Sequence, residues 1–317
     1  MFTTLLKSKP DEDICLLFKV ANHHWNYLCE CGEASELTVK ECQNTHAIFI
    51  SHTHIDHFIN FDRVLRHQIG IQRRVVICGP EGISAQVQAK IKGYCWNLIE
   101  EGSVIYEIRE IISFTDIQIY ELKPPDWELK KIGQITDGFL FQNDKFVTRF
   151  TLLDHKIPTI AYHFKAHDSI NIHLENSSFE GGRWINDLKE AFLQKETERI
   201  IEVQNNTYQA GELFHLIKKN RGETFGIIMD HAASPENHRR IQSLFQDCDK
   251  VFIECFYQAA DKEMAAANFH SYSTESARIM RESAVKLAIP VHFSRRYEAK
   301  DLEIIKAEFQ KEFAGAG

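Results

Sequence analysis

Hydrophobic residues along the chain gather in short runs that are rich in β-branched and aromatic side chains. The runs predicted to be buried strands lie at 47–50, 74–78, 225–229, 251–254 and 289–293. A further β-rich stretch covers 105–164 and contains a turn at Pro124-Pro125-Asp126. Segments with helical periodicity separate these strands, and such alternation predicts a layered α/β fold.

Helical periodicity is clearest in two segments. Residues 84–100 place four apolar side chains on one face, namely Val87, Ile91, Tyr94 and Leu98. Residues 274–288 do the same with Ala277, Met280, Ala284 and Leu287. Both segments are therefore expected to be helices that cover a sheet.

Two more helices complete the pattern. One is predicted to begin at Ser234-Pro235-Glu236, where a capping serine precedes a first-turn proline and an acid. The other covers 302–313. The chain has 317 residues and neither an internal repeat nor a low-complexity linker. We therefore expect a single domain over 1–317.

Composition narrows the class of protein. The hydrophobic fraction of 44% and the charged fraction of 26% are typical of soluble globular proteins. No apolar run approaches the roughly 18 to 20 residues of a membrane span, and lysines and acids interrupt residues 1–13 before a signal sequence could develop. Eight cysteines are too sparse for a disulfide scaffold. We expect a cytoplasmic protein with reduced core thiols and no membrane contact.

The net charge is −8, so the chain as a whole repels polyanions. A nucleic-acid substrate would have to be held by a local basic patch or by bound metal ions. The 16 histidines are more informative, because several of them cluster in the sequence.

The densest cluster follows the predicted strand at 47–50. His52 and His54 share one face of an extended chain, and the next turn brings Asp56 and His57 to the same point. Imidazole and carboxylate ligands favour zinc, although manganese or iron could bind the same atoms. This run predicts a metal-dependent hydrolase, and the alternative is a surface histidine cluster at a strand end.

Four ligands are too few for a site with two metal ions, so further ligands should lie at strand ends downstream. His155, Asp230 and His292 occupy such places, and Asp230 would be the bridging carboxylate. For any one of them alone, a hydrogen-bonded strand-end residue would be an equal alternative. Three at successive strands favour the metal site.

Five segments together resemble the ribonuclease Z family, metallo-β-lactamase-fold endonucleases that trim transfer RNA precursors at their 3′ end. These segments are 51–57, 154–162, Asp230, His270-Ser271 and His292-Phe293-Ser294-Arg295-Arg296-Tyr297. Thioesterases and lactonases of the superfamily share the first, whereas the last is more specific to ribonuclease Z. The resemblance covers nearly the whole chain and implies an α/β fold of four layers, the αββα sandwich.

The resemblance also implies a role for each residue. Seven side chains would hold two zinc ions: His52, His54 and His155 on one, Asp56, His57 and His292 on the other, with Asp230 between them. Asp56 would also orient the attacking hydroxide. His270 would be a catalytic histidine with Glu254 as its acidic partner. The structural alternatives are a helix-capping histidine and an ordinary strand-end acid.

The sequence departs from the family beside these residues. Where the family usually has Gly-Asp-Thr, this chain has Met229-Asp230-His231, and where the family has His-Glu-Ala-Thr it has Ile253-Glu254-Cys255-Phe256. After His57, the segment 58–61 replaces a glycine-bearing turn. The metal ligands remain, while the surroundings that would meet a substrate differ.

Bacterial members carry a Gly/Pro-rich arm that grips the transfer RNA elbow, and a reduced arm-like segment lies here at about 170–200. Its basic residues Arg183, Lys189 and Lys195 are offset by Glu180, Asp187, Glu190 and Glu196. A helix with Leu188, Ala191 and Phe192, packed on the body, explains this segment at least as well as an RNA grip.

Three hypotheses follow. The first is an endoribonuclease that removes the 3′ trailer from transfer RNA precursors, with a homodimer of the family type compatible with the composition. The second keeps the metal site but acts on a small phosphodiester, lactone or ester. The third is a metal-stabilised binding protein without activity. Convergence of Arg63, Arg66, Arg73, Arg74, Arg295 and Arg296 on a wide groove would favour RNA, and a narrow apolar pocket would favour a small substrate.

Overall fold

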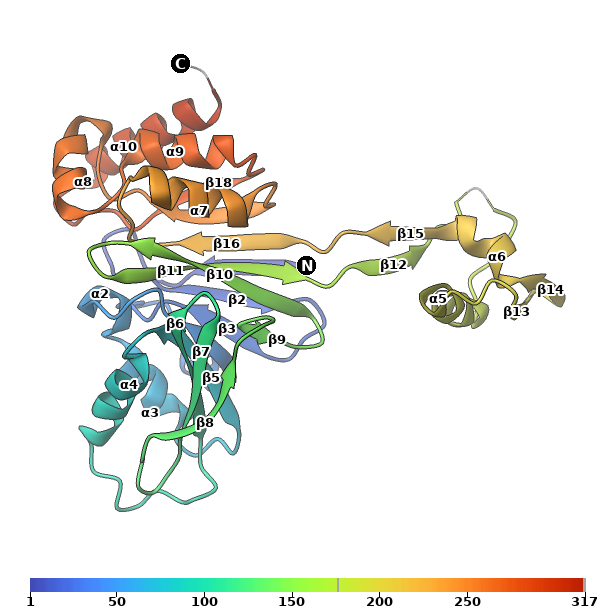
Figure 1. Ribbon diagram of the computed structural model, residues 1–317, viewed down its shortest axis with the longest axis horizontal. Helices are drawn as coiled ribbons and strands as arrows, with labels where there is room; N and C mark the ends of the chain where they lie inside the picture. Colours follow the sequence, from blue (N-terminus) through green and yellow to red (C-terminus); the bar gives the residue numbers. More distant parts are fainter. Residues whose placement is uncertain (176, 316–317) are drawn as a thin grey trace. The chain divides into compact units, whose positions relative to one another are not determined.

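The computed structural model describes residues 1–175 and 177–315, which divide into two compact units (Figure 1). The first unit comprises Met1–Lys165 and Thr224–Gly317, and the second comprises Ala166–Glu223. Each unit has a hydrophobic core of its own.

Eight strands form the first sheet of the larger unit, in the order β1 to β8. Their bounds are Phe2–Leu6, Leu16–Val20, Asn26–Cys29, Thr45–Phe49, Arg74–Pro80, Ile105–Ser113, Asp116–Leu122 and Lys130–Ile135. The strands β3 to β6 run parallel and the others pair antiparallel. Four helices accompany this sheet: α1 (Val39–Asn44), α2 (Ile55–Phe58), α3 (Phe61–Gln68) and α4 (Ile83–Lys92).

The second sheet has the order β18-β17-β16-β11-β10-β9. Its strands, in chain order, are β9 (Phe141–Gln142), β10 (Phe146–Asp154), β11 (Pro158–Ala166), β16 (Thr224–Ile228), β17 (Lys250–Glu254) and β18 (Ala288–Val291). The strands β16, β17 and β18 are parallel, so their carboxyl ends lie at one edge. The helices that follow them are α7 (Pro235–Phe245), α8 (Lys262–Asn268), α9 (Ser273–Glu282) and α10 (Ala299–Phe313).

Aromatic side chains fill the space between the two sheets. Phe18 and Phe49 of the first sheet lie 4.8 and 5.0 Å from Phe164 of the second, measured between ring centroids, and Phe225 stacks on Phe164 at 4.5 Å. The hydroxyl of Tyr162 donates a hydrogen bond to the carbonyl of Ile50 across the layers, at 2.7 Å. Such ring pairs add to the free energy gained from burying their surface.

Helices cover the outer face of each sheet. Figure 1 shows α3 and α4 outside the first sheet and α7, α9 and α10 outside the second. Val64 and Val87 pack into the first outer core, while Phe245 and Met280 pack into the second. The order is therefore helix, sheet, sheet, helix, and the predicted four-layer αββα fold is confirmed.

The predicted strands are all present, and the helix predicted to begin at Ser234 is confirmed; the last helix, predicted over 302–313, begins three residues earlier, at Ala299. Ser234 caps α7 by accepting a hydrogen bond from the backbone amide of Asn237. Two helix ends were wrong. The helix predicted at 84–100 stops at Lys92, with Gly93 at its C-cap, and Leu98 beyond it is 90% exposed. The helix predicted at 274–288 stops at Glu282, and Leu287 is 47% exposed.

The eight cysteines are thiols and form no disulfide in the described chain, and every one except Cys95 is buried. None of the helices in the described chain is both long enough and apolar enough to cross a membrane.

The second unit contains the arm-like segment at about 170–200. Two strand pairs, β12 (Ser169–Ile172) with β15 (Ile217–Asn220) and β13 (Ile200–Val203) with β14 (Asn206–Gln209), accompany α5 (Trp184–Gln194), α6 (Ala210–Leu213) and the short helix Phe214–Leu216. The apolar face of α5 packs inside this unit through Trp184, Leu188 and Ala191. The charged side chains of this unit are partly paired, since Arg199 forms ion pairs with Glu190 and Glu196 at 3.0 and 3.3 Å.

Gly226 in β16 packs closely against Phe245 in the core between the second sheet and its helices. A Cβ at this position would lie 2.2 Å from Cε1 of the buried Phe245. We therefore expect Gly226→Ala to lower the free energy of unfolding by about 1 to 3 kcal/mol, because the core must shift to admit the methyl group. Urea and thermal unfolding of the full chain measure this change.

Gly133→Ala is the matched control, because Gly133 also lies in a strand but the nearest atom to an added Cβ is 3.6 Å away. Its free energy of unfolding should stay within about 0.5 kcal/mol of the parent. Equal midpoints for the two variants would show that Phe245 does not restrict this strand.

Candidate metal centre

The run from Ser51 to His57 crosses from the end of β4 into α2. His54 forms the N-cap of α2, so Asp56 and His57 lie in its first turn. The backbone amide of Ser51 donates a hydrogen bond to the buried Glu30 carboxylate at 3.0 Å, which fixes the turn before His52. Local structure therefore points several ligand-type side chains at one place, as the sequence predicted.

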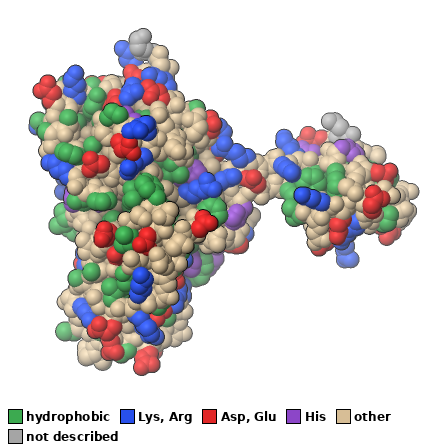
Figure 2. All heavy atoms as spheres, in the orientation of Figure 1, with side chains coloured by type: hydrophobic (Ala, Val, Ile, Leu, Met, Phe, Trp, Pro, Cys, Tyr) green, Lys and Arg blue, Asp and Glu red, His purple; other side chains and the backbone are tan. Residues whose placement is uncertain are grey.

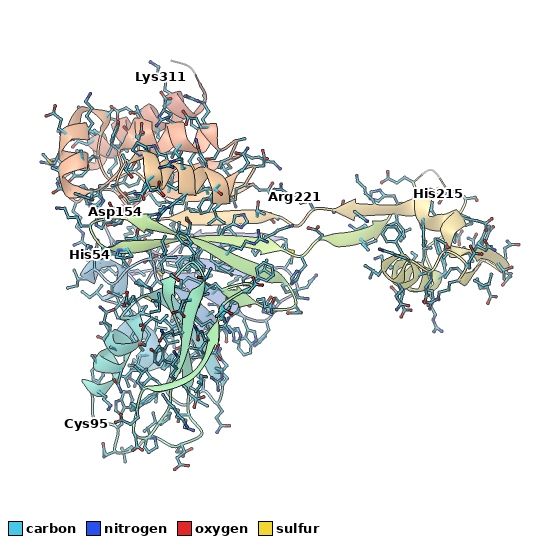
Figure 3. All side chains as sticks on the ribbon, viewed as in Figure 1. His54, Cys95, Asp154, His215, Arg221 and Lys311 are labelled. Carbon is cyan, nitrogen blue, oxygen red and sulfur yellow. The ribbon has the colours of Figure 1, made fainter. Side chains whose placement is uncertain are left out.

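Two groups of side chains meet there. The first contains His52, His54, His155 and Asp230, and the second contains Asp56, His57 and His292; within each group the potential ligand atoms lie within 4.8 Å of one another. Figure 3 labels His54 and Asp154, the neighbour of His155, at these strand ends. All seven predicted ligands are thus brought together, although they come from four separate strand ends.

Asp230 lies between the two groups. Its Oδ2 is 3.8 Å from Nε2 of His52 and 3.4 Å from Nε2 of His155. Its Oδ1 is 3.3 Å from Nε2 of His57 and 3.0 Å from Nδ1 of His292. Each carboxylate oxygen therefore faces a different group, which is the arrangement of a bridging ligand.

Neighbouring acceptors orient the imidazoles. The Nδ1–H of His155 donates to the carbonyl of Phe269 at 2.7 Å, and Nδ1 of His57 donates to the Glu30 carboxylate at 3.1 Å. Such bonds fix the ring orientation and leave Nε2 as the free lone pair. The sequence reasoning missed Glu30, and the signal was an acid placed directly after a buried strand.

The charges of the cluster suit a cation. Burial lowers the pKa of His52 to about 2, so this imidazole is neutral, the form that binds metals. Burial opposes ionisation of Asp230, yet His292 and His57 hold the pKa of this carboxyl well below its usual range. Burial also opposes a charge on His292, but Asp230 raises the pKa of this imidazole to about 9. The same negative charge would equally favour a metal cation.

Unpaired polar atoms in the cluster support the same conclusion. Among the described residues, Nε2 of His52, Nε2 of His57, Oδ1 of Asp230 and Nδ1 of His292 are buried and have no hydrogen-bond partner. Buried polar atoms without a partner each cost about 1 to 3 kcal/mol, and these four converge on one place. Imidazole nitrogens and carboxylate oxygens are ligands for zinc and related ions, so the residues present fit metal ions.

His270 and Glu254 form a pair beside this cluster. The Nδ1–H of His270 donates to Oε2 of the fully buried Glu254 at 2.8 Å. Burial disfavours a charge on either group, but the pair holds the pKa of Glu254 low and raises the pKa of His270. The backbone amides of His231 and Ser271 also donate to Glu254, at 2.8 and 3.1 Å. The predicted partners are therefore in contact.

The six arginines considered from the sequence do not converge on one groove. Arg63 and Arg73 donate to backbone carbonyls, and Arg74 pairs with Glu107 and Glu121. Arg66 lines a separate hollow beside Tyr94, and only Arg295 and Arg296 lie at the metal centre. Figure 2 shows acidic and basic side chains interspersed on the face that it draws.

Known proteins give an independent comparison. No family model matches the chain. A ribonuclease Z from Deinococcus radiodurans is 22% identical over 289 residues, which covers 86% of this chain and 84% of that protein. The metallo-β-lactamase fold protein YhfI from Bacillus subtilis superposes with a TM-score of 0.56 at 13% identity, over 95% of this chain and 86% of the other. This chain has the metallo-β-lactamase fold.

The human tRNase Z short form gives a TM-score of 0.55 at 15% identity and covers 94% of both chains. By sequence, the chain resembles ribonuclease Z over most of its length, as the five segments indicated. The metallo-β-lactamase fold and the clustered ligand-type residues together indicate bound metal ions.

Glu30 offers a test of how the imidazoles are held. Glu30→Gln keeps the shape of the side chain but removes the negative charge that orients His57. We expect metal affinity to fall about 10- to 100-fold, because outer ligands fix the orientation and basicity of inner ones. Competition with a chelator of known affinity, read by metal analysis, measures this change.

Glu110→Gln is the control. Glu110 is also buried, and it accepts a hydrogen bond from the backbone amide of Ser84 at 3.0 Å, outside the cluster. This variant should retain the parent metal affinity. If both variants bound metal as the parent does, Glu30 would have no part in holding His57.

Proposed function

We propose that this protein is a metal-dependent phosphodiesterase, an endoribonuclease that removes the 3′ trailer from transfer RNA precursors. The observation that carries the proposal is the position of Asp230, whose two oxygens face separate groups of ligand atoms 3.0 to 3.8 Å away. The names of the relatives, ribonuclease Z and tRNase Z, supply the choice of RNA.

In this proposal the residues hold two zinc ions. His52, His54 and His155 would hold one, Asp56, His57 and His292 would hold the other, and Asp230 would be a ligand shared by both. When bound, such a metal pair makes a hydroxide available near neutral pH and offsets the charge on the phosphoryl oxygens. The protein contributes a rigid set of ligands, because their strand ends and hydrogen-bond partners are buried.

Side chains would orient the attacking water, accept its proton and support the leaving group. Asp56 is 36% exposed at its side chain and lies 3.6 Å from Nε2 of His292, so its carboxylate can orient the attacking water and accept its proton. Glu254 holds His270 through Nδ1, which leaves Nε2 to support the departing 3′ oxygen. Cleavage in this direction leaves a 3′ hydroxyl on one product and a 5′ phosphate on the other.

The proposal includes a cytoplasmic location and a homodimer. The location follows from the substrate, and light scattering of the purified protein checks the dimer. With a net charge of −8, the chain must hold RNA through local contacts and the metal ions. The binding of RNA at moderate salt should therefore depend strongly on whether metal is present.

Cleavage of precursor transfer RNA by the full-length, zinc-loaded protein tests the function directly. We expect metal-dependent removal of the 3′ trailer, and we expect His54→Ala and Asp230→Asn to lose both bound metal and cleavage. His24→Ala should behave as the parent, because His24 is exposed, stands against the Trp25 ring and is not one of the clustered ligands.

Two results would contradict parts of the proposal. If the protein hydrolysed bis(p-nitrophenyl) phosphate but left a panel of precursors intact, the RNA substrate would be wrong and the chemistry would stand. If metal removal lowered stability and neither parent nor His54→Ala hydrolysed any phosphodiester, the protein would be a metal-stabilised binding protein.

His270 gives a prediction about the departing group. His270→Ala should lower kcat on RNA by about 10²- to 10⁴-fold, because a poor leaving oxygen needs support as its bond breaks. Hydrolysis of bis(p-nitrophenyl) phosphate should fall much less, since p-nitrophenolate leaves easily. Metal content should match the parent. Equal losses on both substrates would assign His270 a role other than leaving-group support.

A further inference from the structure

A hollow of about 410 Å³ adjoins the metal centre. Asp56 and His292 of the centre form part of its lining, so a molecule in the hollow would lie next to the reacting phosphate. Ile55, Ile59, Phe256, Arg295 and Arg296 also line it. Its volume lies within the range of sites for small ligands, which begins at about 300 Å³.

One side of this hollow is apolar. Ile55 and Ile59 lie one turn apart at α2 and are 74% and 46% exposed. Phe256 stands where ribonuclease Z usually has threonine, and its ring stacks on His270 with centroids 3.8 Å apart and planes 4° apart. Exposed apolar side chains that gather beside a reactive cluster mark a binding surface. We call Ile55, Ile59 and Phe256 the apolar wall.

The hollow also contains two guanidinium groups with different partners. Arg295 pairs with Asp13 and with Glu33, the latter at 3.2 Å, so its charge is largely offset. Within 1–175 and 177–315, Arg296 has no carboxylate partner; it contacts the sulfur of Met264 and lies 5.9 Å from the ring centroids of Tyr257 and Tyr297. Arg296 can therefore bind an anion without first breaking an ion pair.

We propose that this hollow is a nucleoside subsite: the apolar wall packs against the base next to the scissile phosphate, and Arg296 binds the following phosphate. This inference rests on the proposed function and names how the substrate is held. A nucleotide has the matching chemistry, since every base has an apolar face and every linkage carries one negative charge. It also gives the net acidic protein local contacts with RNA near the metals.

Model precursors that lack one base test the wall. A single abasic nucleotide is placed on either side of the scissile phosphate in turn. With the parent protein, we expect one of these two substrates to show a kcat/KM about ten- to a hundredfold lower than the complete substrate, as expected for loss of one stacked base. In Ile59→Ser or Phe256→Thr, kcat/KM for the complete substrate should fall. The difference in kcat/KM between the complete substrate and the affected abasic substrate should therefore shrink.

Two further variants separate stacking from simple damage. Phe256→Tyr keeps an aromatic ring and should retain the penalty for the missing base. Ile132→Ser is the matched control for Ile59→Ser, because Ile132 is 45% exposed in β8, outside the hollow. Ile59→Ser carries the test even if Phe256→Thr fails to fold, since the Ile59 side chain is already half exposed.

Salt dependence tests Arg296. Arg296→Gln should reduce the slope of log kcat/KM against log salt by about 0.7 to 1, the change expected for one lost phosphate contact. Arg295→Gln should change the slope less, because Asp13 and Glu33 already offset that charge.

The outcomes distinguish the two proposals. Cleavage of RNA with no penalty for either abasic substrate overturns the subsite and leaves the endoribonuclease standing. Equal salt slopes for the parent and Arg296→Gln overturn the phosphate contact. Failure of the parent to cleave any RNA, with hydrolysis of bis(p-nitrophenyl) phosphate retained, overturns the subsite and the RNA substrate and leaves the phosphodiesterase chemistry standing.

Discussion

The buried carboxylate of Asp230 is the constraint on which the rest of the site depends. Moving a charged carboxylate out of water is costly unless other groups compensate for it. Here the compensation comes from imidazoles that approach both oxygens, with His52 and His155 on one side and His57 and His292 on the other. These imidazoles follow β4, β10 and β18, so both sheets must end at the same place. A change in the register of either sheet would leave the charge uncompensated.

The layer between the sheets provides that alignment. Phe18, Phe49, Phe164 and Phe225 interlock across it, and Tyr162 bonds to the carbonyl of Ile50 two residues before His52. Interiors packed at this density deform little, so the strand ends keep their spacing. Buried acceptors then fix the individual rings, as Glu30 does for His57 and Glu254 does for His270. Global packing sets where each strand ends, and local hydrogen bonds set where each nitrogen points.

The sequence predicted the parts of this structure that depend on local order. His155, Asp230 and His292 could be found because a ligand-type residue at the end of a buried run is visible in one dimension, and the structure brings these residues together. Helix ends were less predictable, since α4 ends at Lys92 although apolar residues continue the helical spacing to Leu98. The role of Glu30 was missed because it depends on His57, 27 positions away in the chain and in contact only after folding.

Burial separates the residues of the site that can be replaced at little cost in stability from those that cannot. Asp230 and its neighbours His52, His57 and His155 are buried, so replacing one of these imidazoles would leave the buried Asp230 carboxylate less compensated. Ile55, Ile59 and Arg296 lie at the surface and hold no buried polar group, so their replacement costs little stability. Phe256 lies between these classes because it contacts both the hollow and His270. A phenylalanine at this position enlarges the apolar surface of the hollow and leaves the clustered ligands in place. Under the proposed function, the ligand cluster would determine the reaction, and the exposed wall beside it would determine which phosphodiester is cleaved.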